Sequence, residues 1–236
     1  MVAKIPSDWA CPPPFDATQT ERGRGSTLKQ VHRTTVLATQ SRIQGTRMAI
    51  LKIARMGNPI LLRNCDPVPD PGAPEIRRLV ADMMQTMEDA PGVGLAGPQV
   101  YVPLRIFVFR VPGDRASADP NSRGVPSTVL INPEIEPIGE EIGLNWEGCL
   151  SIPDLRAVVP RALRIRYRGV DCDGNIIEGE ASRFHARVIQ HEYDHLDGIL
   201  YPMRVTDFRY FGFNSELDRV AEAQRQQEAP QTETAP

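Results

Sequence analysis

The sequence predicts an α+β fold in which a series of short strands precedes one buried helix. Apolar residues recur at helical spacing over 74–89 and again over 184–196, and between these segments they occur in short or alternating runs. Strands that cluster along the chain before a single buried helix are typical of an α+β domain. The expected strands lie at 104–109, 128–131, 157–159 and 163–167.

The first helix is predicted over 74–89 because its apolar residues fall on one face and Pro74 stands in its first turn. That face includes Met83, Met84 and Met87. A methionine stripe is an alternative signal for a metal or partner surface, but methionine fills irregular gaps in cores, so we expect it to pack against a sheet.

The last expected strand alternates Leu163, Ile165 and Tyr167 with arginines, as a half-buried strand does. The arginines at 164, 166 and 168 are expected to form a solvated face beside acidic residues rather than an anion-binding surface. The dipeptide Asp-Gly at 173–174 then predicts a hairpin turn.

The second helix carries His-Glu-Tyr-Asp-His at 191–195. One helical turn separates His191 from His195, so both imidazoles lie on one face and can share a metal ion. Glu192 stands beside them, where it can take a proton from a metal-bound water. Such a string also occurs in ordinary polar helices, so a second motif is needed. His185, which lacks a partner at ligand spacing, is expected to cap the helix or lie at the surface.

A third metal ligand is not found downstream of this helix. The chain has no histidine after His195, and the nearest acid, Asp197, belongs to an Asp-Gly helix ending. Upstream, the run Glu-Gly-Cys-Leu-Ser at 147–151 offers Cys149, whose thiolate two imidazoles and a metal would hold deprotonated. Farther upstream, the glycine-rich run at 92–99 ends in a glutamine, a neutral side-chain donor.

These three motifs together resemble peptide deformylase, the metal hydrolase that removes the formyl group from the N-terminal methionine of new bacterial and organellar polypeptides. The family signatures G-x-G-L-A-A-x-Q, E-G-C-L-S and Q-H-E-x-D-H-L-x-G match residues 92–99, 147–151 and 190–198. Gly97 stands where the family usually has alanine, a change expected to loosen the loop without removing a reacting group. The resemblance covers about residues 48–204 and implies sheets packed around a central helix that bears the two histidines.

The resemblance implies that Cys149, His191 and His195 bind one divalent metal per chain. A thiolate and two imidazoles suit zinc, ferrous iron, cobalt or nickel, and the sequence does not choose among them. The family works with ferrous iron in the cell, so iron is the metal that the resemblance implies.

The resemblance also implies that Glu192 is the general acid/base and that Gln99 and the backbone N–H of Leu150 form the oxyanion hole. A divalent metal lowers the pKa of its bound water from about 16 to near 7. Glu192 can then accept the remaining proton as the hydroxide attacks the formyl carbon, and return it to the leaving amine.

Helix geometry suggests where the substrate's methionine binds. Phe184 and Val188 share the side of the helix that bears His191, and with Val93 they are expected to form an apolar pocket. Arg187 shares that side too, but we expect it to point to the rim or to pair with an acid, and leave it out of the site.

Two glycines are expected to let peptide backbone come close to the site. The extended backbone that includes Gly94 is expected to pair with the substrate like an added strand, and Gly148 permits close approach beside the cysteine. The expected partners are formyl-methionyl nascent peptides, including those still at the ribosome.

The segment 1–47 differs from the rest of the chain, with seven basic residues against three acidic ones, a Pro-Pro-Pro run and no periodicity. We expect a disordered extension or a mis-assigned start, because Met48 opens the chain as bacterial deformylases open; its acids and prolines argue against the alternative, an organellar transit peptide. The catalytic domain is expected over 48–204. Within 205–236 we expect an exposed helix at 215–227 and a disordered tail.

Composition narrows the classes of protein to which this chain could belong and the compartment in which it is expected. The four cysteines are scattered and no export signal precedes them, which favours free thiols in a reducing compartment, and no segment approaches the roughly 20 apolar residues of a membrane span. The net charge of −3 gives no electrostatic footprint for nucleic acid. A cytoplasmic protein is therefore expected.

Overall fold

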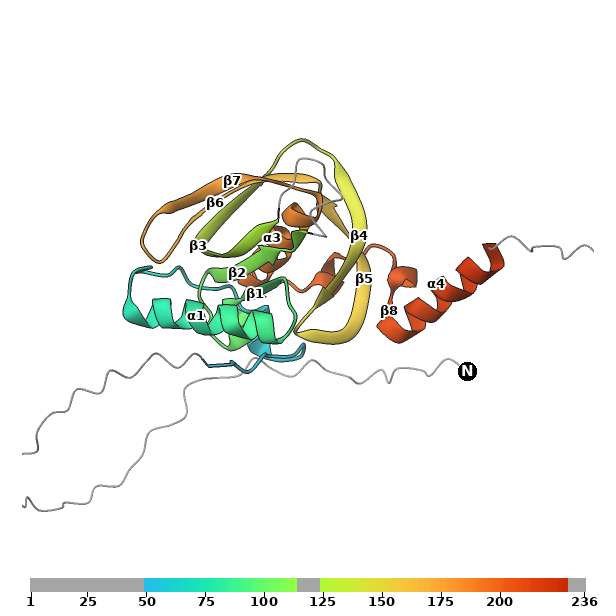
Figure 1. Ribbon diagram of the computed structural model, residues 1–236, viewed down its shortest axis with the longest axis horizontal. Helices are drawn as coiled ribbons and strands as arrows, with labels where there is room; N and C mark the ends of the chain where they lie inside the picture. The colour runs from blue at the N-terminus through green and yellow to red at the C-terminus, as the bar shows by residue number, and fades with distance from the viewer. Residues whose placement is uncertain (1–48, 114–123, 229–236) are drawn as a thin grey trace, which may run out of the picture. The chain divides into compact units, whose positions relative to one another are not determined.

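The computed structural model describes residues 49–113 and 124–228, so the expectations for residues 1–47 and for the end of the chain lie outside the described residues. Figure 1 shows the arrangement of the elements. The α-helices are α1 (Pro74–Asp89), α3 (Arg183–Leu196) and α4 (Asn214–Glu228). The strands are β1 (Gly94–Ala96), β2 (Ile106–Val111), β3 (Val125–Pro137), β4 (Ile142–Cys149), β5 (Ile152–Ala162), β6 (Arg164–Val170), β7 (Ile176–Ser182) and β8 (Phe211–Phe213).

The strands form two antiparallel sheets. The larger sheet has the order β1-β2-β3-β6-β7, and the smaller has the order β4-β5-β8. In β2 the pleat sends alternate residues to opposite faces: Phe107 and Phe109 join one buried cluster, and Ile106 and Val108 join another. The larger sheet is therefore buried on both faces at this strand.

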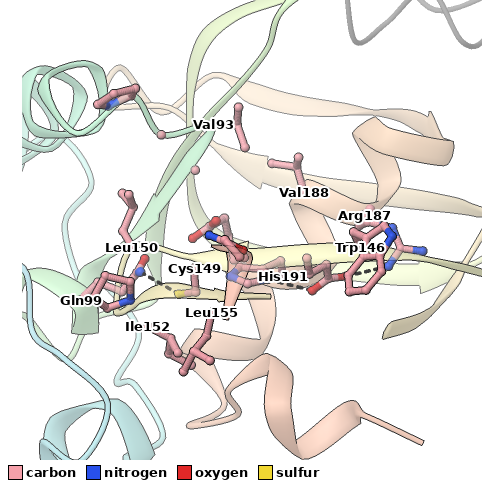
Figure 2. Close-up of a pocket in the computed structure, with 18 of the residues that line it drawn as sticks. Val93, Gln99, Trp146, Cys149, Leu150, Ile152, Leu155, Arg187, Val188 and His191 are labelled. Atoms are coloured by element: carbon pink, nitrogen blue, oxygen red, sulfur yellow. Dashed lines mark hydrogen bonds and ion pairs between the residues drawn. The ribbon is translucent and has the colours of Figure 1, made fainter. Parts of the chain in front are cut away.

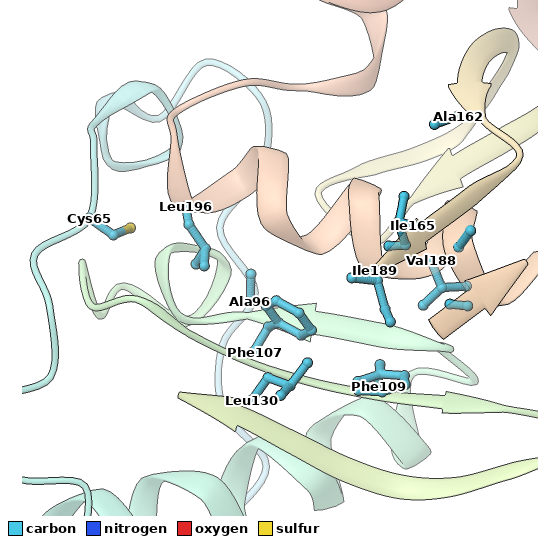
Figure 3. Close-up of a cluster of buried hydrophobic side chains, with 12 residues drawn as sticks. Cys65, Ala96, Phe107, Phe109, Leu130, Ala162, Ile165, Val188, Ile189 and Leu196 are labelled. Atoms are coloured by element: carbon cyan, nitrogen blue, oxygen red, sulfur yellow. The ribbon is translucent and has the colours of Figure 1, made fainter. Parts of the chain in front are cut away.

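Each face of the larger sheet is covered by a helix. Met83 and Met87 of α1 pack in the same cluster as Ile106 and Val108, so the methionine stripe is core, as predicted. On the other face, Ile189 of α3 packs with the side chains of Phe107 and Phe109 in the cluster drawn in Figure 3.

The helix α3 also contacts the smaller sheet, so it lies between the two sheets. A third cluster lies beneath β5, where Ala157 and Val159 pack with Leu200 and Tyr201 from the segment after the helix. The mixed fold predicted from the sequence is confirmed. Because α3 is buried, a row of its polar side chains lies inside the protein, where a reactive site can form.

The structure adds a strand that the sequence patterns missed and corrects one predicted environment. The sequence patterns missed β4 entirely, because this edge strand exposes apolar side chains such as Leu144 and Trp146 instead of alternating toward a core. The surface or capping role expected for His185 is wrong. Its ring is buried, stacks on Phe109 and meets Tyr167 edge-on, and burial lowers its pKa to about 4.

The arginine row of β6 is solvated, as expected, and its members pair with exposed acids, for example Arg164 with Glu180 at 3.0 Å. The described helices include none whose length and apolar character would let it cross a membrane.

Truncating the methionine stripe of α1 should destabilise the fold. Met83 is fully buried, so Met83→Ala should lower the free energy of unfolding by about 2–5 kcal/mol through lost apolar burial and the cavity left behind. Met203→Ala is the matched control, because Met203 is 59 % exposed, and its change should stay within about 0.5 kcal/mol. Chemical denaturation of both variants measures the difference; equal losses would contradict the packing described.

Candidate metal centre

Three potential metal ligands converge where the helix α3 meets the end of β4. The ligand atoms of Cys149, His191 and His195 all lie within 4.8 Å of one another. His195 Nε2 is 3.3 Å from Cys149 Sγ, and the two imidazole rings lie 5.1 Å apart, nearly perpendicular. Among the described residues this group offers one thiolate and two imidazoles, a donor set that fits a divalent transition metal with room for a further ligand.

The surroundings of the two histidines shift their pKa values in opposite directions. Burial holds the pKa of His195 well below its usual value, so this ring is neutral and able to ligate. Burial would also lower the pKa of His191, but hydrogen bonds with Cys149 and Glu147 raise it well above the usual value. The His191 ring therefore holds a proton on each of its nitrogens, and binding of a metal to the ring would displace one of these protons.

The second nitrogen of His191 is held by Glu147. His191 Nδ1 lies 2.9 Å from Glu147 Oε2, which leaves Nε2 facing the other two ligand atoms. Burial would raise the pKa of Glu147, but its hydrogen bonds with His191 and Arg161 outweigh burial and hold that pKa well below its usual range. The carboxylate is ionised, so it accepts a hydrogen bond from Nδ1–H and keeps a proton on that nitrogen of His191.

Glu147 belongs to a buried network of ionic side chains behind the ligands. Arg161 donates to both Glu147 oxygens at 2.9 and 3.0 Å, and also to Asp194 at 2.5 Å. Asp194, from the same helix as the histidines, accepts two further bonds from Arg204 at 2.9 and 2.6 Å. Arg187 donates to Glu147 at 2.7 Å. The network ties α3 to β4, β5 and the segment after the helix.

Glu192 lies beside the candidate ligands and is shielded from solvent. It is 4 % exposed, and its Oε2 has no hydrogen-bond partner in the described part of the chain. Burial raises its pKa to about 7. A Cβ on Gly94 would overlap the Glu192 carboxylate, so the backbone of β1 approaches this side chain as only glycine allows.

Gln99 is oriented by the backbone of its own loop. Its Oε1 accepts from the N–H of Ala96 at 2.8 Å, which turns its NH₂ group toward Ser151 Oγ at 3.1 Å and Cys149 Sγ at 3.4 Å. The expectation that Gly97 loosens this loop is wrong. A Cβ there would lie 2.7 and 2.8 Å from the carbonyl oxygens of Val102 and Leu104, so the loop is packed tightly at that position.

A pocket of about 410 Å³ opens onto this group of residues (Figure 2). The predicted residues that line it are Val93, Gly94, Gln99, Gly148, Cys149, Leu150, Phe184, Val188, His191 and Glu192. His195, at 1 % exposure, lies behind the lining. The structure therefore brings every predicted site residue to one place.

Sequence reasoning missed the residues of the ionic network. Glu147 opens one of the recognised motifs and Asp194 lies within another, yet neither had been given a role. For Arg187, the alternative that it pairs with an acid holds, and it also lines the pocket. The sequence did contain a signal that Arg187 belongs to the site, because it stands one helical turn before His191.

Comparisons with known proteins agree with this geometry. A family model described as polypeptide deformylase matches residues 50–210. Peptide deformylase 1 of Xanthomonas axonopodis pv. citri (strain 306) is 52 % identical over 168 residues, which make up 71 % of this chain and 97 % of that protein.

Solved structures are similar as well. The Met-Ala-Ser bound class I type b peptide deformylase from Acinetobacter baumannii is 34 % identical with a TM-score of 0.61, and the match covers 67 % of this chain and 100 % of that one. Peptide deformylase from Ehrlichia chaffeensis in complex with actinonin is 31 % identical with a TM-score of 0.63, covering 78 % of this chain and 100 % of that one.

The close approach at Gly94 can be tested by adding one methyl group. Gly94→Ala should displace the Glu192 carboxylate and lower turnover of a formyl-methionyl peptide by roughly 100-fold, while the chain still folds and binds metal. Gly72→Ala is the control, because the nearest atom to its Cβ lies at an ordinary 3.4 Å. Normal turnover by the Gly94 variant would show that the carboxylate does not need this position.

Proposed function

Since the chain belongs to the polypeptide deformylase family, we propose which of its residues perform the family's reaction. The protein is a metal-dependent hydrolase that removes the N-formyl group from the N-terminal methionine of newly synthesised polypeptides and releases formate. The observation that carries the assignment is the convergence of Cys149, His191 and His195 at a pocket that also contains Glu192.

Cys149, His191 and His195 are the proposed ligands of one divalent metal per chain. A metal held there would act as a Lewis acid and make a water molecule nucleophilic at neutral pH. We propose ferrous iron as the native metal, because the family resemblance implies it and the donor set is compatible with it; the same donors also suit zinc, nickel or cobalt. Metal analysis of protein purified without oxygen decides among them.

Glu192 is the proposed general acid/base. A carboxylate whose pKa burial raises to about 7 can both accept and return a proton near neutral pH. Its Oε2, which has no partner among the described residues, would take a proton from the attacking water and deliver it to the amine nitrogen as the formyl C–N bond breaks.

Gln99 and Leu150 are the proposed oxyanion hole. The bond from the Ala96 N–H fixes the Gln99 amide, so its NH₂ group is already turned toward the site before substrate binds. The backbone N–H of Leu150 follows Cys149 directly and would be held in place by the metal ligand. Each donor would stabilise the negative charge that grows on the formyl oxygen.

The substrate would place its methionine side chain against Val93, Phe184 and Val188, which line the pocket. Gly94 lies in β1, an edge strand of the larger sheet, so its outer edge could pair with an extended peptide; Gly148 also lines the pocket. We propose nascent formyl-methionyl chains at the ribosome as the substrates, and the cytoplasm, where bacterial chains of this kind are made, as the location.

Formate release from formyl-Met-Ala-Ser, with the metal content measured on the same oxygen-free sample, tests the proposal as a whole. Release that depends on about one metal per chain is expected. A metal-loaded, folded protein that leaves this peptide intact would contradict it.

Glu192→Gln removes the proton acceptor and keeps the shape of the side chain. We expect about one metal per chain to remain bound and kcat to fall roughly 100-fold or more, the usual contribution of a general acid/base. Glu178→Gln, at an exposed position on β7, should leave both unchanged. Loss of the metal from the Glu192 variant would make this residue a ligand instead.

Cys149→Ser should cost the protein both its metal and its activity, because a serine hydroxyl is rarely ionised at neutral pH and ligates weakly. Cys172→Ser is the matched control, since Cys172 is a free, half-buried thiol outside the group of ligands, and it should change neither quantity. Equilibrium dialysis against cobalt gives the affinities. A Cys149 variant with normal metal affinity and turnover would overturn the assigned centre.

A further inference from the structure

Arg187 lines the substrate pocket, but the proposed chemistry gives it no role. Its side chain comes from α3, between the pocket residues Phe184 and Val188 and one turn before His191. It is 6 % exposed, so a charged side chain lies buried beside a site expected to hold an apolar methionine. Such a group needs partners for every donor that is removed from water.

The guanidinium of Arg187 finds these partners in the smaller sheet. Its Nη1 donates to Glu147 Oε1 at 2.7 Å and to the carbonyl of Val159 at 2.8 Å, with a longer bond of 3.4 Å to the carbonyl of Asn145. Its Nη2 donates to the carbonyl of Gly143 at 2.7 Å. One side chain therefore joins α3 to both β4 and β5.

These contacts bear on β4 more than on any other element. β4 is an edge strand, paired with β5 along one side, and it ends at the metal ligand Cys149. The Arg187 bonds fix the first half of β4 through Gly143 and its second half through Glu147. The distance between the strand that carries the thiolate and the helix that carries the imidazoles thus depends on this guanidinium.

The stem of Arg187 has a different environment from its head. Figure 2 draws Arg187 among the residues that line the pocket. Because its head is directed to acceptors of β4 and β5, the methylene groups are the part available to the pocket. Phe184, Arg187, Val188 and His191 follow one another at helical spacing and all line the pocket, so the stem of Arg187 shares their face of the helix.

We propose that Arg187 is a positioning and specificity-determining residue: its methylene stem contacts the first side chain of the substrate, and its guanidinium sets the separation of β4 from α3. The proposal rests on the proposed function, since it assigns the pocket to that side chain. Lysine cannot replace this arginine, because a single ammonium group cannot reach the carboxylate and the separate carbonyls together.

Three substitutions separate the stem from the head. Arg187→Met keeps an unbranched stem and removes the guanidinium, Arg187→Ala removes both, and Arg187→Lys keeps the charge without the planar fork. Arg164→Met is the matched control, because that arginine is exposed on β6 and pairs with Glu180 away from the pocket. Thermal unfolding and metal content establish that each variant is folded and loaded.

The measurement is kcat and KM for formyl-Met-Ala-Ser and formyl-Phe-Ala-Ser with each loaded variant. Arg187→Ala should shift the ratio of kcat/KM toward the bulkier phenylalanine substrate by about tenfold or more, the scale of a methylene-sized change in an apolar pocket. Arg187→Met should keep the wild-type ratio within about threefold but lower kcat roughly 10- to 100-fold, because the separation of β4 from α3 is no longer fixed. Arg187→Lys should lose kcat like the Met variant.

Each contrary result overturns a specific part of the inference. Wild-type kcat in Arg187→Met, or full rescue by Arg187→Lys, would show that the bonds to the β4 and β5 carbonyls do not position the site. An unchanged kcat/KM ratio for the two substrates in Arg187→Ala would show that the stem does not contact the substrate. If the Ala variant does not fold, the Lys and Met variants, which keep the stem, give the test. A tenfold shift of their kcat/KM ratio would contradict the assignment of substrate preference to the stem. A wild-type protein without deformylase activity would instead contradict the proposed function.

Discussion

The buried carboxylate of Glu147 connects the two halves of the metal centre. It accepts hydrogen bonds from Arg161 and Arg187 and interacts with His191, so that one side chain on β4 binds the helix that carries two of the three proposed ligands. A carboxylate at 6 % exposure is tolerated only because these partners compensate for the water it has lost. Removing one member of such a buried group typically costs about 3–5 kcal/mol, since the remaining charges keep their desolvation penalty.

The same region holds a second carboxylate with the opposite chemistry. Glu147 is surrounded by cationic donors and stays ionised, whereas burial without a hydrogen-bond partner at Oε2 raises the pKa of Glu192 to about 7. Their surroundings therefore give these two carboxyl groups different roles: Glu147 is an anion that orients His191, and Glu192 is the proposed proton carrier. The arrangement depends on keeping the arginines with Glu147 and away from contact with Glu192.

Close backbone packing at two glycines also fixes the geometry of the site. Gly94 lets β1 pass against the Glu192 carboxylate, and Gly97 lets the next turn pack on the carbonyls of Val102 and Leu104. The second contact fixes the loop that presents Gln99. At both positions a methyl group would occupy space that backbone or carboxylate atoms already fill, so the glycines define how near the loop comes to the metal centre.

Local patterns in the sequence determined the helices and the chemistry of the donors. Helical spacing predicted 74–89 as observed, and the spacing of His191 and His195 placed both rings on one face because the helix repeat is a local property. The three motifs contain most of the predicted pocket residues, and helical spacing before His191 predicted Phe184 and Val188. The strand β4, the burial of His185 and the partners of Arg187 came only from the tertiary structure. Arg187 meets Gly143 across 44 positions and His191 meets Glu147 across 44 positions, and no local periodicity encodes which buried donor will face which acceptor at that separation.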